Sequence, residues 1–168
     1  MRQILAAYYE RWQYKHPRPG DFFRVANEVS GRDLSPFFDQ VYRGSAVFDY
    51  GVEDVRSRPS GDDTFLSEVI VRRYGDGIFP VSVLMTLEDG STRKESWDGT
   101  GRWTRFSVDD RSRVISAQVD PDQILLLDVN FTNNSFTASP QTRRAATKWA
   151  LKWMVWLQDQ LLTWAFLA

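Results

Sequence analysis

The sequence contains no cysteine and only one histidine, His16, in 168 residues. A catalytic zinc usually has three protein ligands, most often histidines, and only carboxylates are left to join His16. Carboxylates suit harder cations than zinc. The same scarcity excludes thiol chemistry and any Ser–His–Asp site that does not use His16. We therefore predict that this chain is not an enzyme and has no catalytic residue, no metal ligand and no cofactor.

The sequence also lacks a strong excess of charge of either sign. It has 21 Lys and Arg and 22 Asp and Glu, which gives a net charge of −1. No bulk attraction to nucleic acid is expected, and we predict no nucleic-acid partner. A chain of this length suits one compact unit, or one sandwich domain with helical appendages, and buries enough surface to fold without disulfides. The absence of cysteine is therefore compatible with any compartment. Aromatic residues, in contrast, are abundant, with seven tryptophans.

The first quarter of the sequence has the pattern of three short helices. The first has apolar residues at three- and four-residue spacing: Leu5, Tyr8, Tyr9 and Trp12. The second has one apolar stripe: Phe22, Val25, Ala26 and Val29. We expect Gly31 to end this helix in a left-handed cap and Asp33 to cap a third helix over residues 34–42. A sequence that begins inside a helical pattern suggests a segment of a longer protein.

From about Val47 the hydrophobic period changes from 3.6 to 2, which is typical of strands. Seven alternating runs are separated by turn residues: 48–56, 65–74, 81–87, 92–97, 103–108, 114–119 and 124–129. In the third run, Val81, Val83, Met85 and Leu87 are expected to face the core, with Ser82 on the opposite face. The pattern favours an α+β chain with a seven-stranded, antiparallel, immunoglobulin-like β-sandwich. A closed barrel is the alternative.

The last segment is helical and almost wholly apolar from residue 149 to residue 168, although Lys152 and Asp159 interrupt it. A transmembrane helix needs about 20 mostly apolar residues, and a central Asp costs roughly 3 kcal/mol. We therefore expect a helix that docks in a groove between domains rather than one that spans a membrane. Seating on anionic lipid, helped by four basic residues beside the tryptophans, is the alternative: Arg143, Arg144, Lys148 and Lys152. The expected interaction surface consists of four tryptophans: Trp149, Trp153, Trp156 and Trp164.

Two groups of aspartates could in principle ligate calcium, since hard cations bind clustered carboxylates. One group is Asp120, Asp122 and Asp128, and the other is Asp62 with Asp63. Their spacing matches no known calcium loop, and aspartates in such positions usually form turns. We therefore expect no bound cation.

Three further motifs also have structural interpretations that we favour. The Gly-rich run Tyr74-Gly75-Asp76-Gly77 lacks the lysine and helix of a phosphate-binding loop and is expected to be a turn. Asn130 and Asn133 match the glycosylation acceptor pattern, which is frequent by chance, and turn formation explains them better. His16 is expected to be a partly buried ring at a helix–helix junction, bonded to nearby backbone.

Two runs of the first 45 residues resemble the end of the catalytic domain in M1-family (aminopeptidase N-like) zinc metallopeptidases. There a helix start of the form HP-x-P-x-DF precedes a helix of the form SG-x-DL-x-x-FF-x-x-W. The matching residues here are His16-Pro17-Arg18-Pro19-Gly20-Asp21-Phe22-Phe23 and Ser30-Gly31-Arg32-Asp33-Leu34-Ser35-Pro36-Phe37-Phe38. Val41 stands where the family usually has tryptophan. In that family a β-sandwich domain follows, as the periodicity independently predicts here.

The resemblance implies a non-catalytic role, because no residue here matches the family's HExxH motif, its third zinc ligand, its GxMEN loop or its catalytic tyrosine. The expected organisation is residues 1–45 as the end of a helical peptidase domain, 46–132 as the β-sandwich and 133–168 as a C-terminal helix. The implied partner is an upstream peptidase domain that holds the zinc. In isolation, a second copy of the chain could form a weak homodimer. The alternative is an independent binding module for a peptide, a glycan or a membrane surface.

Overall fold

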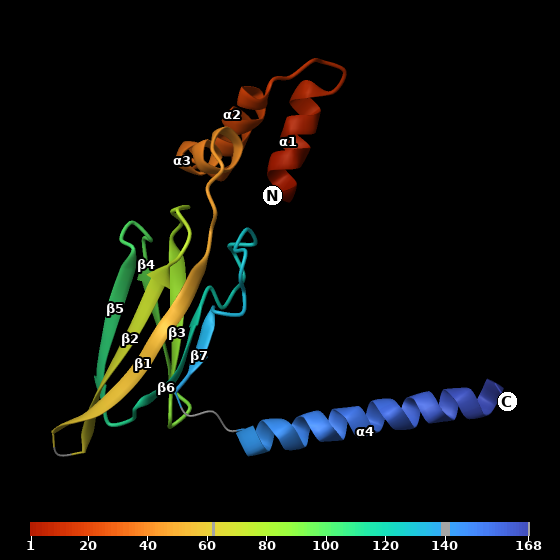
Figure 1. Cartoon of the computed structure of the whole chain (residues 1–168). Coiled ribbons are helices and arrows are strands. Elements are labelled where there is room, and N and C mark those ends of the chain that lie inside the picture. Colours follow the sequence, from red (N-terminus) through yellow and green to blue (C-terminus); the bar gives the residue numbers. More distant parts are fainter. Residues whose placement is uncertain (62, 139–141, 168) are drawn as a thin grey trace.

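The computed structural model describes residues 1–61, 63–138 and 142–167, the last range as backbone alone over 142–145 and 165–167. These residues form an α+β structure with four α-helices and two antiparallel sheets. Helices α1, α2 and α3 lie beyond one end of the sheets, and the long helix α4 leaves from the other end (Figure 1). The elements are α1 (Arg2–Trp12), α2 (Pro19–Ser30), α3 (Ser35–Phe38), a π-helical turn η1 (Asp39–Arg43) and α4 (Thr142–Leu167).

The seven strands divide into two sheets, so the arrangement is not a closed barrel. One sheet has the order β1-β2-β5 and the other the order β4-β3-β6-β7. Their bounds are β1 (Tyr50–Gly61), β2 (Thr64–Arg73), β3 (Val81–Leu87), β4 (Thr92–Trp97), β5 (Trp103–Asp110), β6 (Val114–Val119) and β7 (Ser135–Thr137). We refer to β1–β7 and their loops as the sandwich.

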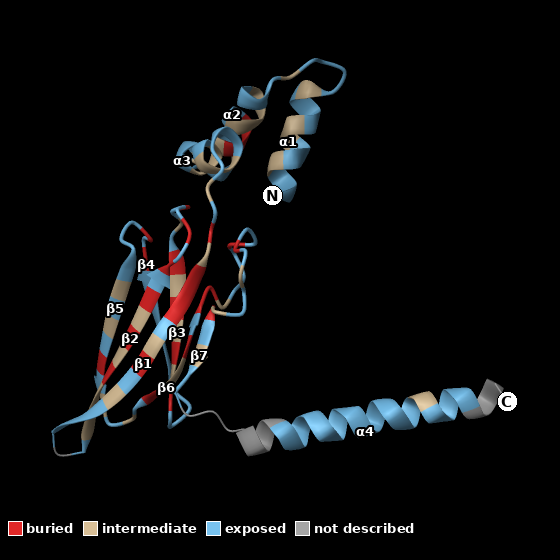
Figure 2. Cartoon of the chain, viewed as in Figure 1, coloured by how far each residue is buried: buried red, intermediate tan, exposed pale blue. Residues whose placement is uncertain are grey.

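The core lies between the two sheets (Figure 2). Val69 and Val71 of β2 and Val83 and Met85 of β3 are completely buried. The alternation expected along β3 is confirmed, because its odd-numbered residues from 81 to 87 are all buried. Ser82 is not on an open surface, however, since its Oγ is buried and has no hydrogen-bond partner among the described residues.

The expected strand over residues 124–129 is wrong, and the seventh strand lies instead at residues 135–137. The cause is local: Asp120 has a φ of 47° and its carboxylate accepts the N–H groups of Ile124 and Leu125, at 3.0 and 2.8 Å. The backbone donors of this run are thus held by a side chain, so a loop forms although the residues are apolar. As a consequence, the second sheet extends beyond residue 132 into the segment expected to hold only the C-terminal helix.

The second N-terminal helix ends where the sequence indicates, but the third, expected over residues 34–42, is α-helical only over Ser35–Phe38 and continues as the π-helical turn η1. Gly31 ends α2 with a φ of 66°, as expected for a left-handed cap. The Asp33 carboxylate accepts the Ser35 N–H at 2.9 Å at the start of α3. On α1, Tyr8 packs edge-on against Phe22, with ring centroids 5.2 Å apart. The stripe expected on α1 is only partly buried, because Leu5 and Tyr9 are exposed.

The helices join the sandwich through aromatic contacts of Phe37 and through hydrogen bonds. The Phe37 ring lies 6.0 Å from that of Phe79, which follows β2. The Gln40 side chain accepts the Ile78 N–H at 2.6 Å and donates to the Ile78 carbonyl at 3.0 Å. The Val47 N–H donates to Asp76 at 2.7 Å. The loop between β2 and β3 therefore anchors the helical segment.

Candidate interaction surface

Helix α4 spans 26 residues and contains neither glycine nor proline. Its many alanine, leucine, lysine and glutamine residues favour helix formation. The Thr163 hydroxyl donates to the backbone carbonyl of Asp159 at 2.8 Å, so its hydrogen bond is made within the helix. Figure 1 shows the helix projecting away from both sheets.

The four tryptophans predicted to form an interaction surface are all exposed on α4. Their exposed fractions lie between 51% for Trp153 and 69% for Trp164. Six aliphatic side chains of the helix are also half exposed or more: Leu151, Met154, Val155, Leu157, Leu161 and Leu162. Monomeric proteins rarely expose a contiguous apolar surface of this kind, which is typical of an interaction site.

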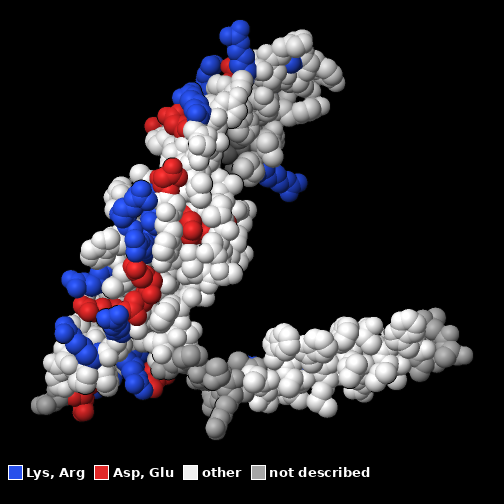
Figure 3. Space-filling model, viewed as in Figure 1, with Lys and Arg blue, Asp and Glu red and all other residues white. Residues whose placement is uncertain are grey.

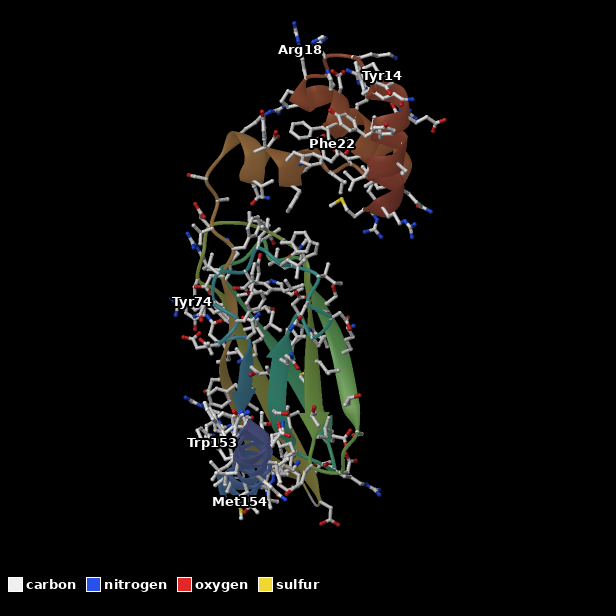
Figure 4. The ribbon with its side chains drawn as sticks, turned by 90° about the vertical axis from the view of Figure 1, so that its right-hand side faces the viewer. Tyr14, Arg18, Phe22, Tyr74, Trp153 and Met154 are labelled. Carbon is white, nitrogen blue, oxygen red and sulfur yellow. The ribbon has the colours of Figure 1, made fainter. Side chains whose placement is uncertain are left out.

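Three of the tryptophans contact one another along one side of the helix. The rings of Trp149 and Trp153 lie 5.9 Å apart, and those of Trp153 and Trp156 lie 5.2 Å apart in an edge-on arrangement. With Lys152 they line a shallow hollow of about 360 Å³. Trp153 and Met154 point out of α4 in different directions (Figure 4), so apolar side chains cover more than one side.

Charges are sparse on the helix surface and abundant on the sandwich. In Figure 3, the visible face of α4 is nearly white, whereas the sandwich carries both signs of charge. The charged residues Lys148, Lys152 and Asp159 share one narrow stripe of α4 with Thr163, whereas other polar residues, such as Gln158, lie elsewhere on the helix. Among the described residues, no helix combines the length and apolar character needed to cross a bilayer. Of the four basic residues that the lipid alternative invokes, Lys148 and Lys152 are exposed on α4, whereas the side chains of Arg143 and Arg144 lie outside the described residues.

The calcium candidates have structural roles where they are described. Both carboxylate oxygens of Asp120 bind backbone N–H groups, and Asp122 forms an ion pair with Lys94. Asp128 accepts the Asn130 N–H at 3.0 Å and the Asn134 side-chain amide at 3.1 Å. Asp62 lies outside the described residues, and Asp63 has a φ of 70° between β1 and β2. Within the described ranges, no group of three His, Cys, Asp or Glu residues could hold a metal ion.

The Gly-rich run 74–77 is a turn that organises one end of the sandwich. The Gly75 carbonyl accepts hydrogen bonds from the guanidinium groups of Arg73 and Arg102, at 2.9 and 3.0 Å. The Tyr50 hydroxyl donates to the Gly77 carbonyl at 3.2 Å and accepts the Phe79 N–H at 2.8 Å. Burial raises the pKa of Tyr50, against the opposing effect of the Phe79 N–H. The carbonyl groups of this loop thus serve the fold.

The two glycosylation-like asparagines form structural hydrogen bonds, and His16 lies on the surface. The Asn130 side chain accepts hydrogen bonds from the N–H and hydroxyl of Thr132, at 3.3 and 2.5 Å, as a turn former does. The Asn133 amide donates to Asp49 at 2.8 Å. His16 is exposed, which corrects the expectation of a partly buried ring. The connection between α1 and α2 leaves it in solvent because no neighbouring element covers that turn in Figure 1.

Sequence reasoning missed an apolar cavity of about 210 Å³ between the helices and the sandwich. Its lining comes from α1, α2, α3 and the loop after β2: Met1, Ile4, Phe22, Ala26, Leu34, Phe37, Phe38 and Phe79. In the sequence, each of these residues has the apolar pattern of an ordinary core residue within its own helix or loop. Only their meeting across the junction creates the cavity, and no local pattern signals it.

Comparisons of the chain with protein-family models, with curated proteins and with solved structures find no match. The functional proposals below therefore depend on the residues and on their arrangement.

Proposed function

We propose that this chain is the non-catalytic C-terminal module of an M1-like zinc aminopeptidase, in which α1–α3 complete the wall of the peptidase domain and the sandwich buttresses it. The observation that carries the proposal is the exposed apolar stripe on α1. Leu5 and Tyr9 are 51% and 65% exposed and lie four residues apart on α1, whereas Tyr8 of the same helix packs against Phe22 of α2. A neighbouring helical domain would cover this stripe.

The residues that carry the family resemblance have identifiable local roles, which supports the proposal. Asp21 accepts the Arg18 N–H at 2.8 Å and so closes the start of α2, where Pro19 is the first residue. Phe23 stacks on Phe38 with ring centroids 4.2 Å apart. These residues set the angle between helices rather than perform chemistry, so a structural module would retain them.

We further propose that the two sheets form an immunoglobulin-like sandwich. The first, second and fifth strands share one sheet, while the third, sixth and seventh share the other, which matches the immunoglobulin pairing of A, B and E against C, F and G. The fourth strand lies beside the third here, whereas in constant-type domains it joins the first sheet. This departure is compatible with related sandwich domains, which differ in topology.

The reading frame of the gene provides the first test. An in-frame HExxH motif upstream of Met1 would support the peptidase module, whereas a reading frame that starts at Met1 would contradict it and favour an independent binding module. For the chain alone, we expect no stoichiometric zinc and no hydrolysis of aminoacyl-anilides. Zinc at one equivalent, with chelator-sensitive hydrolysis, would overturn the non-catalytic assignment.

Substitution of the exposed stripe provides a second test. In this chain, Leu5→Asp should change the free energy of unfolding by less than about 0.5 kcal/mol, because the side chain is exposed. In the longer protein the same change should lower the melting temperature and the aminopeptidase rate, because it puts a charge into a domain interface. Gln3→Asp, on the same helix, is the control and should have little effect in both. Equal tolerance of Leu5→Asp in both proteins would contradict the proposal.

A further inference from the structure

One side of α4 has the spacing of a helix that packs lengthwise against another helix. Trp149, Trp153, Trp156 and Gln160 follow at intervals of four, three and four residues. At 100° per residue they fall within an arc of about 60°. Gln160 is the one described side chain between residues 146 and 164 that is partly buried, which fits its place among the tryptophans. We call these four residues the tryptophan seam.

Two opposite charges flank the tryptophan seam on the same edge. Lys152 and Asp159 lie seven residues apart, which is two helical turns, and neither forms an ion pair with another described residue. If a second α4 packed on the seam in a parallel orientation, this edge would face the apolar residues on the other edge of its neighbour. In an antiparallel pair, this edge of one helix faces the same edge of the other helix. Lys152 of each copy then faces Asp159 of the other.

The register that pairs these charges also matches the rest of the helix. It places Trp153 against Trp156 of the second copy, and Trp149 against Gln160 of the second copy. The Trp149 indole N–H could then donate to the Gln160 side-chain oxygen, which satisfies the polar group within the seam. The same register puts Thr142 opposite Leu167. The whole of α4 overlaps its partner, over a length of about 39 Å.

We propose that α4 pairs with the α4 of a second copy of this chain, antiparallel, through the tryptophan seam and the Lys152–Asp159 register. Six tryptophans would be buried across the pair, and because a buried tryptophan covers 150–250 Å², they supply on the order of 1,000 Å². That area reaches the lower limit of a specific protein interface. The pairing does not depend on the proposed relation to peptidases.

A second apolar row lets two such pairs join. Ala150, Met154, Leu157 and Leu161 follow the same three–four spacing, about 100° around the helix from the tryptophan seam. In a four-helix bundle, each helix contacts its two neighbours through faces that lie roughly 90° apart around its own axis. The assembly expected in solution is therefore a dimer or a tetramer of antiparallel pairs.

Charge reversal tests the register. Sedimentation equilibrium of the full chain should show association for the wild type. Lys152→Glu and Asp159→Lys should each weaken it about tenfold, because each change puts like charges together at two symmetry-related places. The double variant Lys152→Glu/Asp159→Lys should restore the dissociation constant to within about threefold of the wild-type value. Lys148→Glu is the matched control, because in this register Lys148 faces Thr163 of the second copy rather than a charge, and the change should leave association nearly unchanged.

Cysteine crosslinking tests the orientation, since the natural chain has no cysteine. Ala146 should lie opposite Thr163 of the second copy. A mixture of the Ala146→Cys and Thr163→Cys variants should therefore form a disulfide between the two different chains on mild oxidation. Each variant alone should form little, because the two copies of either position lie at opposite ends of an antiparallel pair. Circular dichroism should show equal helix content in all the variants.

Several outcomes would overturn the proposal. They are a monomeric wild type, single reversals that the double variant does not rescue, and crosslinks within each variant alone. A chain that is monomeric in buffer but binds vesicles of phosphatidylcholine and phosphatidylglycerol would assign the tryptophan seam to a lipid surface instead. Association that depends on Trp153 and Trp156 and also follows the charge-reversal pattern would support the antiparallel pair.

Discussion

Arg73 donates its guanidinium Nε–H to the carbonyl oxygen of Gly99 at 3.0 Å, which joins the end of β2 to the turn after β4. A second hydrogen bond from the same guanidinium reaches Gly75 at 2.9 Å. Arg73 is only 6% exposed and forms no ion pair among the described residues. It therefore acts as a buried donor that organises two loops at the end of the sandwich nearest the helices.

Replacement of this donor should be costly. Arg73→Met removes the hydrogen bonds to both loops and leaves the Gly99 carbonyl without this donor, whereas the Gly75 carbonyl keeps the donor from Arg102, so the free energy of unfolding should fall by about 2 kcal/mol. Arg105→Met is the control, since Arg105 forms only an exposed ion pair with Glu68, and it should cost less than about 1 kcal/mol. Urea unfolding measures both. Equal midpoints for the two variants would contradict the role assigned to Arg73.

Gly75 should not tolerate a side chain. A Cβ at this position would lie 2.0 Å from the Val47 carbonyl oxygen, which is backbone and cannot move aside. Gly75→Ala should therefore destabilise the protein by more than about 2 kcal/mol. Gly20→Ala in α2 meets no atom within 4 Å and should be neutral or slightly stabilising. Thermal unfolding compares the two, and a stable Gly75→Ala protein would show that the loop is packed differently.

The register of β3 predicts at which positions of the sandwich a charged side chain can be introduced without loss of stability. Val83→Asp buries an unpaired carboxylate in the core, and we expect a loss of more than about 3 kcal/mol or failure to fold. The control is Gln118→Asp on the neighbouring strand β6, where the residue is exposed and pairs with Leu84; it should cost under about 1 kcal/mol. Ser82 is unsuitable as a control because its hydroxyl is buried. Similar melting temperatures for the two variants would show that β3 has another register.

Acid should weaken the junction between the helices and the sandwich. The Val47 N–H lowers the pKa of Asp76 below the ordinary value of about 4. Near this pKa the folded state therefore binds fewer protons than the unfolded state. The stabilisation that Asp76 adds to the free energy of unfolding is then complete above about pH 4 and is lost as the pH falls through the pKa of the folded state. The free energy of unfolding of Asp76→Asn should thus differ most from that of the wild type near neutral pH. Urea unfolding at several pH values checks this, and a difference that stays constant down to about pH 2 would contradict it.

Part of the candidate surface is evident from the amino-acid sequence. The tryptophans of α4, the interruptions at Lys152 and Asp159 and the helical spacing are all sequence properties, and together they indicate an interaction helix. The exposure of both Leu5 and Tyr9 could not be identified in this way. In a pattern, an apolar residue that is covered by a neighbouring helix and one that is left in solvent look the same.

The sequence by itself determined the elements whose cause is local. Gly31 ends α2 through a left-handed cap, Asp33 accepts a backbone N–H just before α3 although Leu34 is the N-cap of that helix, and the alternation of Val81, Val83, Met85 and Leu87 specifies both a strand and its inner face. These features depend on backbone sterics and on a period of two or 3.6 residues, which operate within a few positions.

Tertiary structure alone decided the features that join distant segments. The short segment 135–137 became a strand because it pairs with the edge of β6. The partition of the strands into two sheets and the anchoring of η1 by the loop after β2 likewise depend on contacts between residues far apart in the chain. Hydrophobic patterning reports which residues seek burial, but the partner that buries them is a property of the folded chain.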